Sequence, residues 1–140
     1  MQTTLFQTAA KSILFLAAIL FAATATADDL YSTKVDGKLK VGEQGTVTLT
    51  ITPGKGFKWN KDYPAKLTLE NGEKVELSKL QYKKVKGEIT GDDKAGKIAI
   101  SGKGKSAGQA TIKGQIKFSV CSPETCKLLK EDISIAVAVE

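Results

Sequence analysis

The chain has no histidine and no arginine. Without histidine it cannot build the base of a Ser-His-Asp or Cys-His nucleophile, nor a histidine-based zinc site. Without arginine it lacks the side chain that makes most bidentate contacts with bases and phosphates. Nucleic-acid binding is therefore not expected, although the net charge is +6. The lysines alternate with acidic residues, which predicts a solvated surface; the alternative is a weak affinity for an anionic membrane or cell-wall polymer.

Long apolar runs are equally scarce, because only Ser12–Ala23 is apolar over more than a few residues. This run is shorter than the roughly 20 apolar residues that a membrane-spanning helix needs. It follows the basic Lys11 and precedes the small-residue motif Ala25–Ala27. That order predicts a signal peptide over residues 1–27, cleaved after Ala27, and export to the periplasm. Residues 28–140 are then expected to form one domain with no membrane span.

Residues 28–140 show no sustained helical periodicity. Apolar residues alternate instead with polar ones, as in Val47, Leu49 and Ile51, which is typical of half-buried strands. The expected strands are 34–41, 46–52, 65–70, 74–77, 97–101, 109–120 and 133–139. About seven short strands with regular turn signals favour an all-β, immunoglobulin-like β-sandwich. The lysines and the glycine of 34–41 favour an edge position for that strand.

Glycine and asparagine mark the expected connections. Asn71-Gly72 predicts a hairpin between 65–70 and 74–77, with Leu80 extending the apolar set of its second arm. The polar, glycine-punctuated segment 83–96 predicts a loop or an irregular edge, and 101–108 predicts a loop.

Residues 99–106 are similar to a phosphate-binding loop, with alanine in place of the first glycine. An alternating strand follows rather than the helix that such a loop needs, so a lysine-glycine hairpin loop is expected. The pair Asp92-Asp93 lies in a glycine-rich turn, and nothing near it suggests a glycosidase.

Cys121 and Cys126 are the chain's two cysteines, separated by four residues. In an oxidising compartment one intramolecular disulfide can close this turn. As a structural bridge over so short a loop, it would contribute only about 2 kcal/mol. A redox role would need a stabilised thiolate, which Lys127 and Lys130 would favour and two nearby glutamates would oppose. Both interpretations remain open, whereas a zinc site, which needs four ligands, is not expected. No cofactor is expected either.

Three aromatic residues, Phe57, Trp59 and Tyr63, occur within seven positions. One interpretation is an exposed binding loop. The other is a plug at one end of the sandwich, where Trp59 or Phe57 buries a large apolar area.

These features together resemble a known family. The segment 114–121, followed closely by Cys126 and preceded by the Pro53–Trp59 turn, is similar to the N-terminal periplasmic domain of the thiol:disulfide interchange protein DsbD family. The resemblance runs loosely from Thr46 to Val139. It implies an immunoglobulin-like fold whose two cysteines cycle between dithiol and disulfide and pass electrons to periplasmic partners. Carried over by position, Cys121 and Cys126 are that redox pair.

The chain also departs from the family. The family has five residues between its cysteines, and it shields them with a loop that carries an aromatic side chain, whereas 83–93 has no aromatic residue. The family's membrane domain is not in this sequence, so electrons would come from periplasmic thiol-disulfide proteins or a separate membrane thiol carrier. The first hypothesis is thus thiol–disulfide interchange. The alternative is a non-enzymatic secreted binding or accessory module with a structural disulfide.

Overall fold

A computed structural model describes residues 30–140. The predicted signal peptide and its cleavage site lie outside this range. One short 3-10 helix, η2 (Lys84–Lys86), accompanies the strands. The strands are β1 (Tyr31–Asp36), β2 (Gln44–Pro53), β3 (Lys58–Trp59), β4 (Lys66–Leu69), β5 (Val75–Leu77), β6 (Gln81–Lys83), β7 (Ile89–Gly91), β8 (Gly96–Gly104), β9 (Gly108–Cys121) and β10 (Cys126–Val139).

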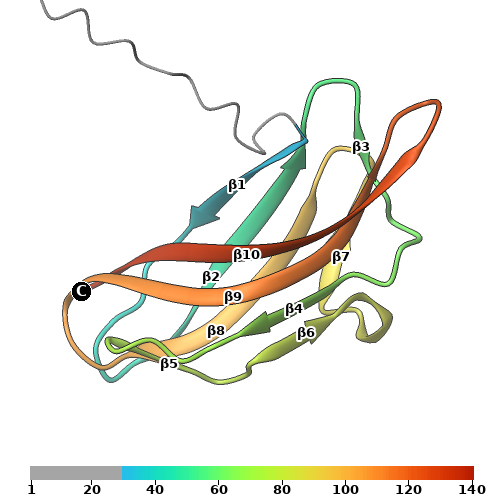
Figure 1. The fold of residues 1–140 in the computed structure, drawn as a ribbon. Helices are drawn as coiled ribbons and strands as arrows, with labels where there is room; N and C mark the ends of the chain where they lie inside the picture. The colour runs from blue at the N-terminus through green and yellow to red at the C-terminus, as the bar shows by residue number, and fades with distance from the viewer. Residues whose placement is uncertain (1–29) are drawn as a thin grey trace, which may run out of the picture.

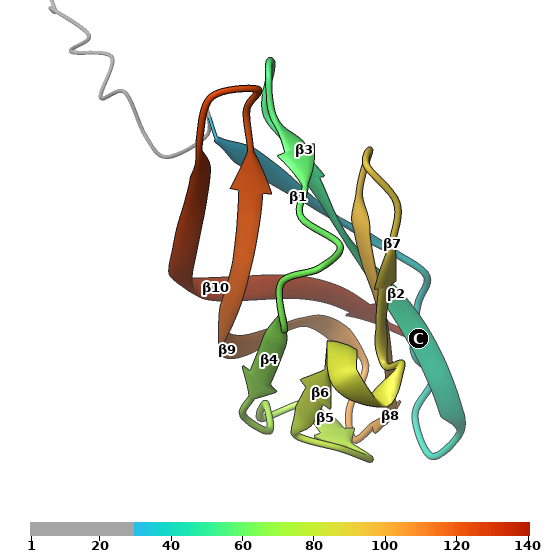
Figure 2. The ribbon, with the colours of Figure 1, turned by 90° about the vertical axis from the view of Figure 1, so that its right-hand side faces the viewer.

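Two antiparallel sheets form the predicted immunoglobulin-like β-sandwich (Figure 1). The first sheet has the order β1-β2-β8-β5, and β7 also pairs with β8. The second has the order β10-β9-β4-β6, and β3 also pairs with β9. Figure 2 shows the two sheets as separate layers. The described residues form ten strands rather than about seven, because β3 and β7 lie in segments expected to be turns or loops and β6 lies where no strand was predicted.

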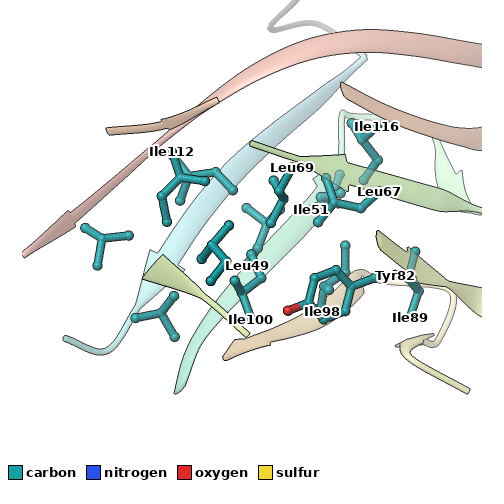
Figure 3. Packing of buried hydrophobic residues seen from close by; sticks show 14 of the residues in the cluster. Leu49, Ile51, Leu67, Leu69, Tyr82, Ile89, Ile98, Ile100, Ile112 and Ile116 are labelled. Atoms are coloured by element: carbon teal, nitrogen blue, oxygen red, sulfur yellow. The ribbon is translucent and has the colours of Figure 1, made fainter. Parts of the chain in front are cut away.

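The core lies between the sheets and consists mainly of aliphatic side chains (Figure 3). Val47, Leu49 and Ile51 are at most 1% exposed, as their alternation with threonine predicts. The inward positions of β9 and of the last third of β10 supply the opposite wall. These are Ala110, Ile112, Ile116, Phe118, Val120, Ile135, Val137 and Val139. Ile133, at the start of the strand predicted over 133–139, is half-buried against the core.

The predicted Asn71-Gly72 hairpin is wrong. β4 pairs with β6 and β9, whereas β5 pairs with β8 in the other sheet. The Asn71 side chain instead accepts a hydrogen bond from the backbone N–H of Leu77 at 2.8 Å and so stabilises the crossing between the sheets. Period-two alternation places side chains on one face of a strand but does not show which strand is the neighbour. Leu80, expected among the core residues, is 42% exposed.

The segment 83–96 contains more structure than a loop. It includes η2 and β7, and Ile89 of β7 is 2% exposed and pairs with Ile98 of β8. The strand predicted at 97–101 is also longer than expected, since β8 continues through Gly104. A Cβ atom at Gly102 would come within 2.7 Å of the carbonyl oxygen of Glu76. Glycine here permits close packing of backbones inside a strand, and no phosphate-binding loop is formed at 99–106.

The strand predicted at 34–41 is divided at Gly37, whose φ is +105°. β1, on the N-terminal side, is an edge strand of the first sheet, as the lysines and the glycine of 34–41 predict. On the C-terminal side, Leu39 is 1% exposed and bridges to Val139 of the second sheet. This crossing joins the two sheets at the end of the molecule where the chain terminates (Figure 1).

Candidate functional site

The two cysteines lie at the tip of the hairpin formed by β9 and β10. All fourteen residues of each strand are paired, and the register places Cys121 directly opposite Cys126. The predicted disulfide joins them, with a Cα–Cα distance of 3.9 Å. The adjacent pair, Ser122 and Thr125, shares a backbone hydrogen bond of 2.8 Å. The cysteines therefore occupy the next, closely approaching pair position without backbone hydrogen bonds between them.

The turn beyond the disulfide is organised by Ser122. Its Oγ accepts hydrogen bonds from the backbone N–H groups of Glu124 at 3.3 Å and Thr125 at 3.2 Å. Pro123 follows it, in the position where a β-turn favours proline after serine. The sequence therefore specifies a tight turn even without the disulfide.

The two sulfur-bearing residues differ in exposure. Cys126 is exposed, whereas Cys121 is half-buried. Cys121 lies on the central strand β9, where β10 covers one side and Lys58 of β3 pairs with it on the other. Cys126 lies on β10, which within residues 30–140 has no strand partner on its other side at this end. A reacting thiol can thus approach Cys126 more easily than Cys121.

The β2–β3 loop lies beside the tip of the β9–β10 hairpin (Figure 2). The loop and the hairpin tip enclose a pocket of about 460 Å³, lined by Gly56, Phe57, Lys58, Cys121, Ser122 and Pro123. Phe57 is half-buried and contributes an aromatic wall. The structure thus brings together two features that the sequence presents separately, the aromatic segment and the cysteine pair.

Trp59 does not belong to this surface. It is 2% exposed and stacks on Phe118, with ring centroids 5.4 Å apart. Tyr31 packs edge-on against the same Phe118 ring, with ring centroids 5.0 Å apart. The burial of Trp59 agrees with the plug interpretation of the aromatic segment, and the role of this segment in binding stays a prediction. Tyr63 is half-buried and packs against the core.

Glycines make room for the Trp59 indole. A Cβ atom at Gly96 would come within 2.6 Å of the indole ring, and one at Gly91 within 3.2 Å of its Nε1 atom. The Nε1–H group is buried and has no hydrogen-bond partner among the described residues. Asp93, in the turn between β7 and β8, accepts a backbone hydrogen bond of 3.0 Å from Trp59. The indole thus anchors β3, and with it the wall of the pocket.

Gly96→Ala is expected to lower the free energy of unfolding by about 1–3 kcal/mol, the usual cost of overpacking. The added methyl group meets the indole ring, which is itself stacked on Phe118 in the core. Urea unfolding followed by circular dichroism would measure the loss. The double variant Gly96→Ala/Trp59→Phe should lose less than the sum of the two single losses. Strict additivity would show that the glycine and the indole do not compete for this space.

The aspartates of the β7–β8 turn have a structural role. The Asp92 carboxylate accepts backbone hydrogen bonds from Lys94 at 2.8 Å and Ala95 at 3.1 Å, which lower its pKa. Asp93 lies 3.6 Å from Lys58 and 3.4 Å from Lys61. This turn therefore fixes both ends of β3. Lys127 and Lys130, which follow Cys126 in sequence, form no ion pair within residues 30–140.

One residue of the site was not anticipated from the sequence. Leu128 is 69% exposed, two positions along β10 from Cys126 and on the same face. The sequence does contain a pattern that places Leu128 on the surface. If the alternation that turns Ile135 and Ile133 inward is continued back to Cys126, positions 126, 128 and 130 lie on the outer face. In residues 30–140 no group of acidic residues and cysteines is arranged to hold a metal ion, and no helix is long and apolar enough to cross a membrane.

No protein-family model and no curated protein matches the chain. Among solved structures, the fold is similar to AggA, the major subunit of aggregative adherence fimbriae type I from Escherichia coli. The identity is 9% and the TM-score 0.35, over 79% of this chain and 94% of that chain. At this TM-score and identity the likeness supports no conclusion about this chain.

Proposed function

We propose that this protein is a periplasmic thiol–disulfide interchange domain that exchanges electrons with partner proteins through Cys121 and Cys126. The observation that carries the proposal is the position of the disulfide. It closes the tip of a hairpin, one of its cysteines is exposed, and an aromatic-walled pocket adjoins the other. The signal peptide predicted at residues 1–27 supports export. The place of the cysteines, directly after the segment 114–121 and at a hairpin tip, agrees with the resemblance to the DsbD family, although their spacing is one residue shorter.

A purely structural role explains this position less well. The bridge closes a six-residue loop, so chain entropy gives it only about 2 kcal/mol. The hairpin it closes is already held by fourteen residue pairs and by the Ser122 turn. The disulfide thus contributes little to the stability of the hairpin and is accessible to a partner. Both properties favour a redox-active bond over a structural one.

The exposures indicate the order of events. A partner thiolate attacks Sγ of Cys126, the S–S bond breaks, and Cys121 leaves as a thiolate that takes up a proton. The partner's second thiolate then attacks the mixed disulfide and releases Cys126 as a thiol. Two electrons have passed to this protein and the partner holds the disulfide. The reduced protein reverses the sequence with an oxidised partner, and β9 and β10 keep the two thiols opposite each other throughout.

The reduction potential of the Cys121–Cys126 pair tests the proposal. The protein would be equilibrated in graded thiol buffers, its free thiols trapped, and the products measured by mass. We expect a midpoint between about −180 and −270 mV, the range of exchange proteins. A midpoint below about −300 mV is typical of structural bridges and would contradict the proposal.

One observation favours a second candidate, a non-enzymatic binding or accessory module. Leu128 is exposed beside the disulfide, and a partner bound at this tip would remove its apolar surface from water, which favours association. The same titration separates the two functions. A strongly reducing midpoint together with unchanged partner capture after reduction of the bridge would favour the binding module.

A further inference from the structure

Four lysines form a row across the outer face of the second sheet. The register pairs Lys130 of β10 with Lys117 of β9, Lys117 with Lys66 of β4, and Lys66 with Lys83 of β6. Directly opposite residues of antiparallel strands point to the same face. Lys117 lies between the buried Ile116 and Phe118, so this face is the outer one. We call these residues, Lys66, Lys83, Lys117 and Lys130, the lysine row.

The lysine row has no balancing charge of its own. Within residues 30–140 none of its four members forms an ion pair, although seven other lysines do. At the β10 end, Asp132 lies two positions from Lys130 on this face, and its carboxylate already accepts a hydrogen bond from Gln115 at 3.0 Å. At the β6 end, the Glu88 carboxylate accepts a hydrogen bond from the backbone N–H of Lys83 at 2.8 Å, and its ion pair is with Lys79 rather than with a lysine of the row. Like charges in directly opposite positions destabilise a sheet. The arrangement therefore opposes folding and calls for another explanation.

The lysine row shares its face with the disulfide. Cys121 follows Lys117 by four positions on β9, and Cys126 precedes Lys130 by four positions on β10, a separation of about 13 Å along an extended chain. Leu128 lies between them, 69% exposed and opposite Ser119. The outer face thus presents, in order, a reactive bond, one large apolar side chain and a line of positive charge.

We propose that the lysine row docks an acidic surface of the partner thiol protein, placed about 13 Å from the partner's reacting cysteine. This inference rests on the proposed interchange function and adds the charge that a partner must carry. A partner protein fits better than a lipid surface, because the row, the apolar side chain and the disulfide occupy one face at the spacing of one docked molecule. The attraction acts mainly on the rate of encounter and is screened by salt.

The test uses two synthetic thiol peptides. Each has one cysteine, a four-residue neutral spacer that spans the distance to the row, and then four glutamates or four glutamines. The rate at which each peptide opens the oxidised Cys121–Cys126 disulfide is divided by its rate with hydroxyethyl disulfide, which corrects for thiol reactivity. We expect the glutamate peptide to react about 10-fold faster at about 20 mM salt. The advantage should disappear near about 0.5 M salt.

Two double variants with the same change of net charge complete the test. Lys117→Gln/Lys130→Gln should remove most of the advantage of the glutamate peptide and leave the glutamine peptide unaffected. Lys97→Gln/Lys105→Gln, which alters exposed lysines outside the row, should leave both rates unchanged.

Three other outcomes would overturn the inference. Equal rates for both peptides would exclude a role of the row in docking, while leaving interchange intact. Failure of both peptides to open the disulfide would contradict the proposed function itself. Equal rates combined with row-dependent binding to phosphatidylglycerol vesicles would assign the row to a lipid surface instead.

Discussion

Cys121→Ser is expected to trap a mixed disulfide on Cys126, and Cys126→Ser to abolish exchange. In the first variant the exposed Cys126 thiolate attacks a partner disulfide, but no second thiol remains to resolve the product. In the second, the remaining thiol is half-buried between β3 and β10 and reacts slowly. Mass spectrometry after incubation with glutathione disulfide would detect the adduct on the first variant.

The controls are the reduced wild-type protein and the double variant. The reduced wild-type protein should convert glutathione disulfide to two glutathione molecules and recover its own disulfide, with no lasting adduct. The double variant Cys121→Ser/Cys126→Ser should remain folded, with a loss of about 2 kcal/mol in the free energy of unfolding. Equal trapping by both single variants would contradict the assigned order of attack. Full exchange activity in either would contradict the function.

Trp59→Ala is expected to lower the free energy of unfolding by about 3–5 kcal/mol, the usual cost of removing a large buried aromatic side chain. The indole is stacked on Phe118 and fitted against Gly96, so neither neighbour can close the space left behind. Because the chain has a single tryptophan, the urea transition must be followed by circular dichroism rather than fluorescence. The comparison is valid only if the free energy of unfolding depends on urea concentration with the same slope in the variant and in the wild-type protein.

The variant Trp59→Phe separates two contributions of Trp59 to the free energy of unfolding, the packing of its ring and the burial of its N–H group. It keeps an aromatic ring on Phe118 and removes an N–H that is buried without a partner among the described residues, so the loss should be clearly smaller than for alanine. Phe57→Ala should cost less than Trp59→Ala, because Phe57 is only half-buried. A small stability loss for Trp59→Ala combined with lost partner capture would favour the binding-loop interpretation.

Alternation predicted strand positions well and strand partners poorly. Val47, Leu49 and Ile51 lie in the core because polar threonines separate them, and each strand can be recognised from its own residues. The pairing of β5 with β8 rather than β4 depends on residues far apart in the chain, and Asn71-Gly72 suggested the wrong neighbour. Glycines were misleading for a related reason. From the sequence alone Gly102 indicates a loop. In the structure it lies within β8, where the backbone of β5 leaves no room for a Cβ atom.

In the site, too, local features could be predicted from the sequence, whereas features that depend on strand pairing could not. The disulfide and its turn follow from the local sequence, because Ser122 and Pro123 specify a tight hairpin end. The pocket beside it does not, since Phe57 reaches the cysteines only through the pairing of β3 with β9. The lysine row is even less visible, because its members come from four strands and meet only in the assembled register.

The unpaired side of β10 has a further consequence for self-association. Among residues 30–140, this strand has a bridge partner on that side only at its C-terminal end, where Leu39 meets Val139. The remaining backbone groups could pair with the same strand of a second molecule, and such edges are common starting points for aggregation. Lys130 lies on this edge and ends the lysine row there. Two copies joined with their rows aligned would form one line of eight positive charges, so the feature that attracts an acidic partner also keeps identical molecules apart.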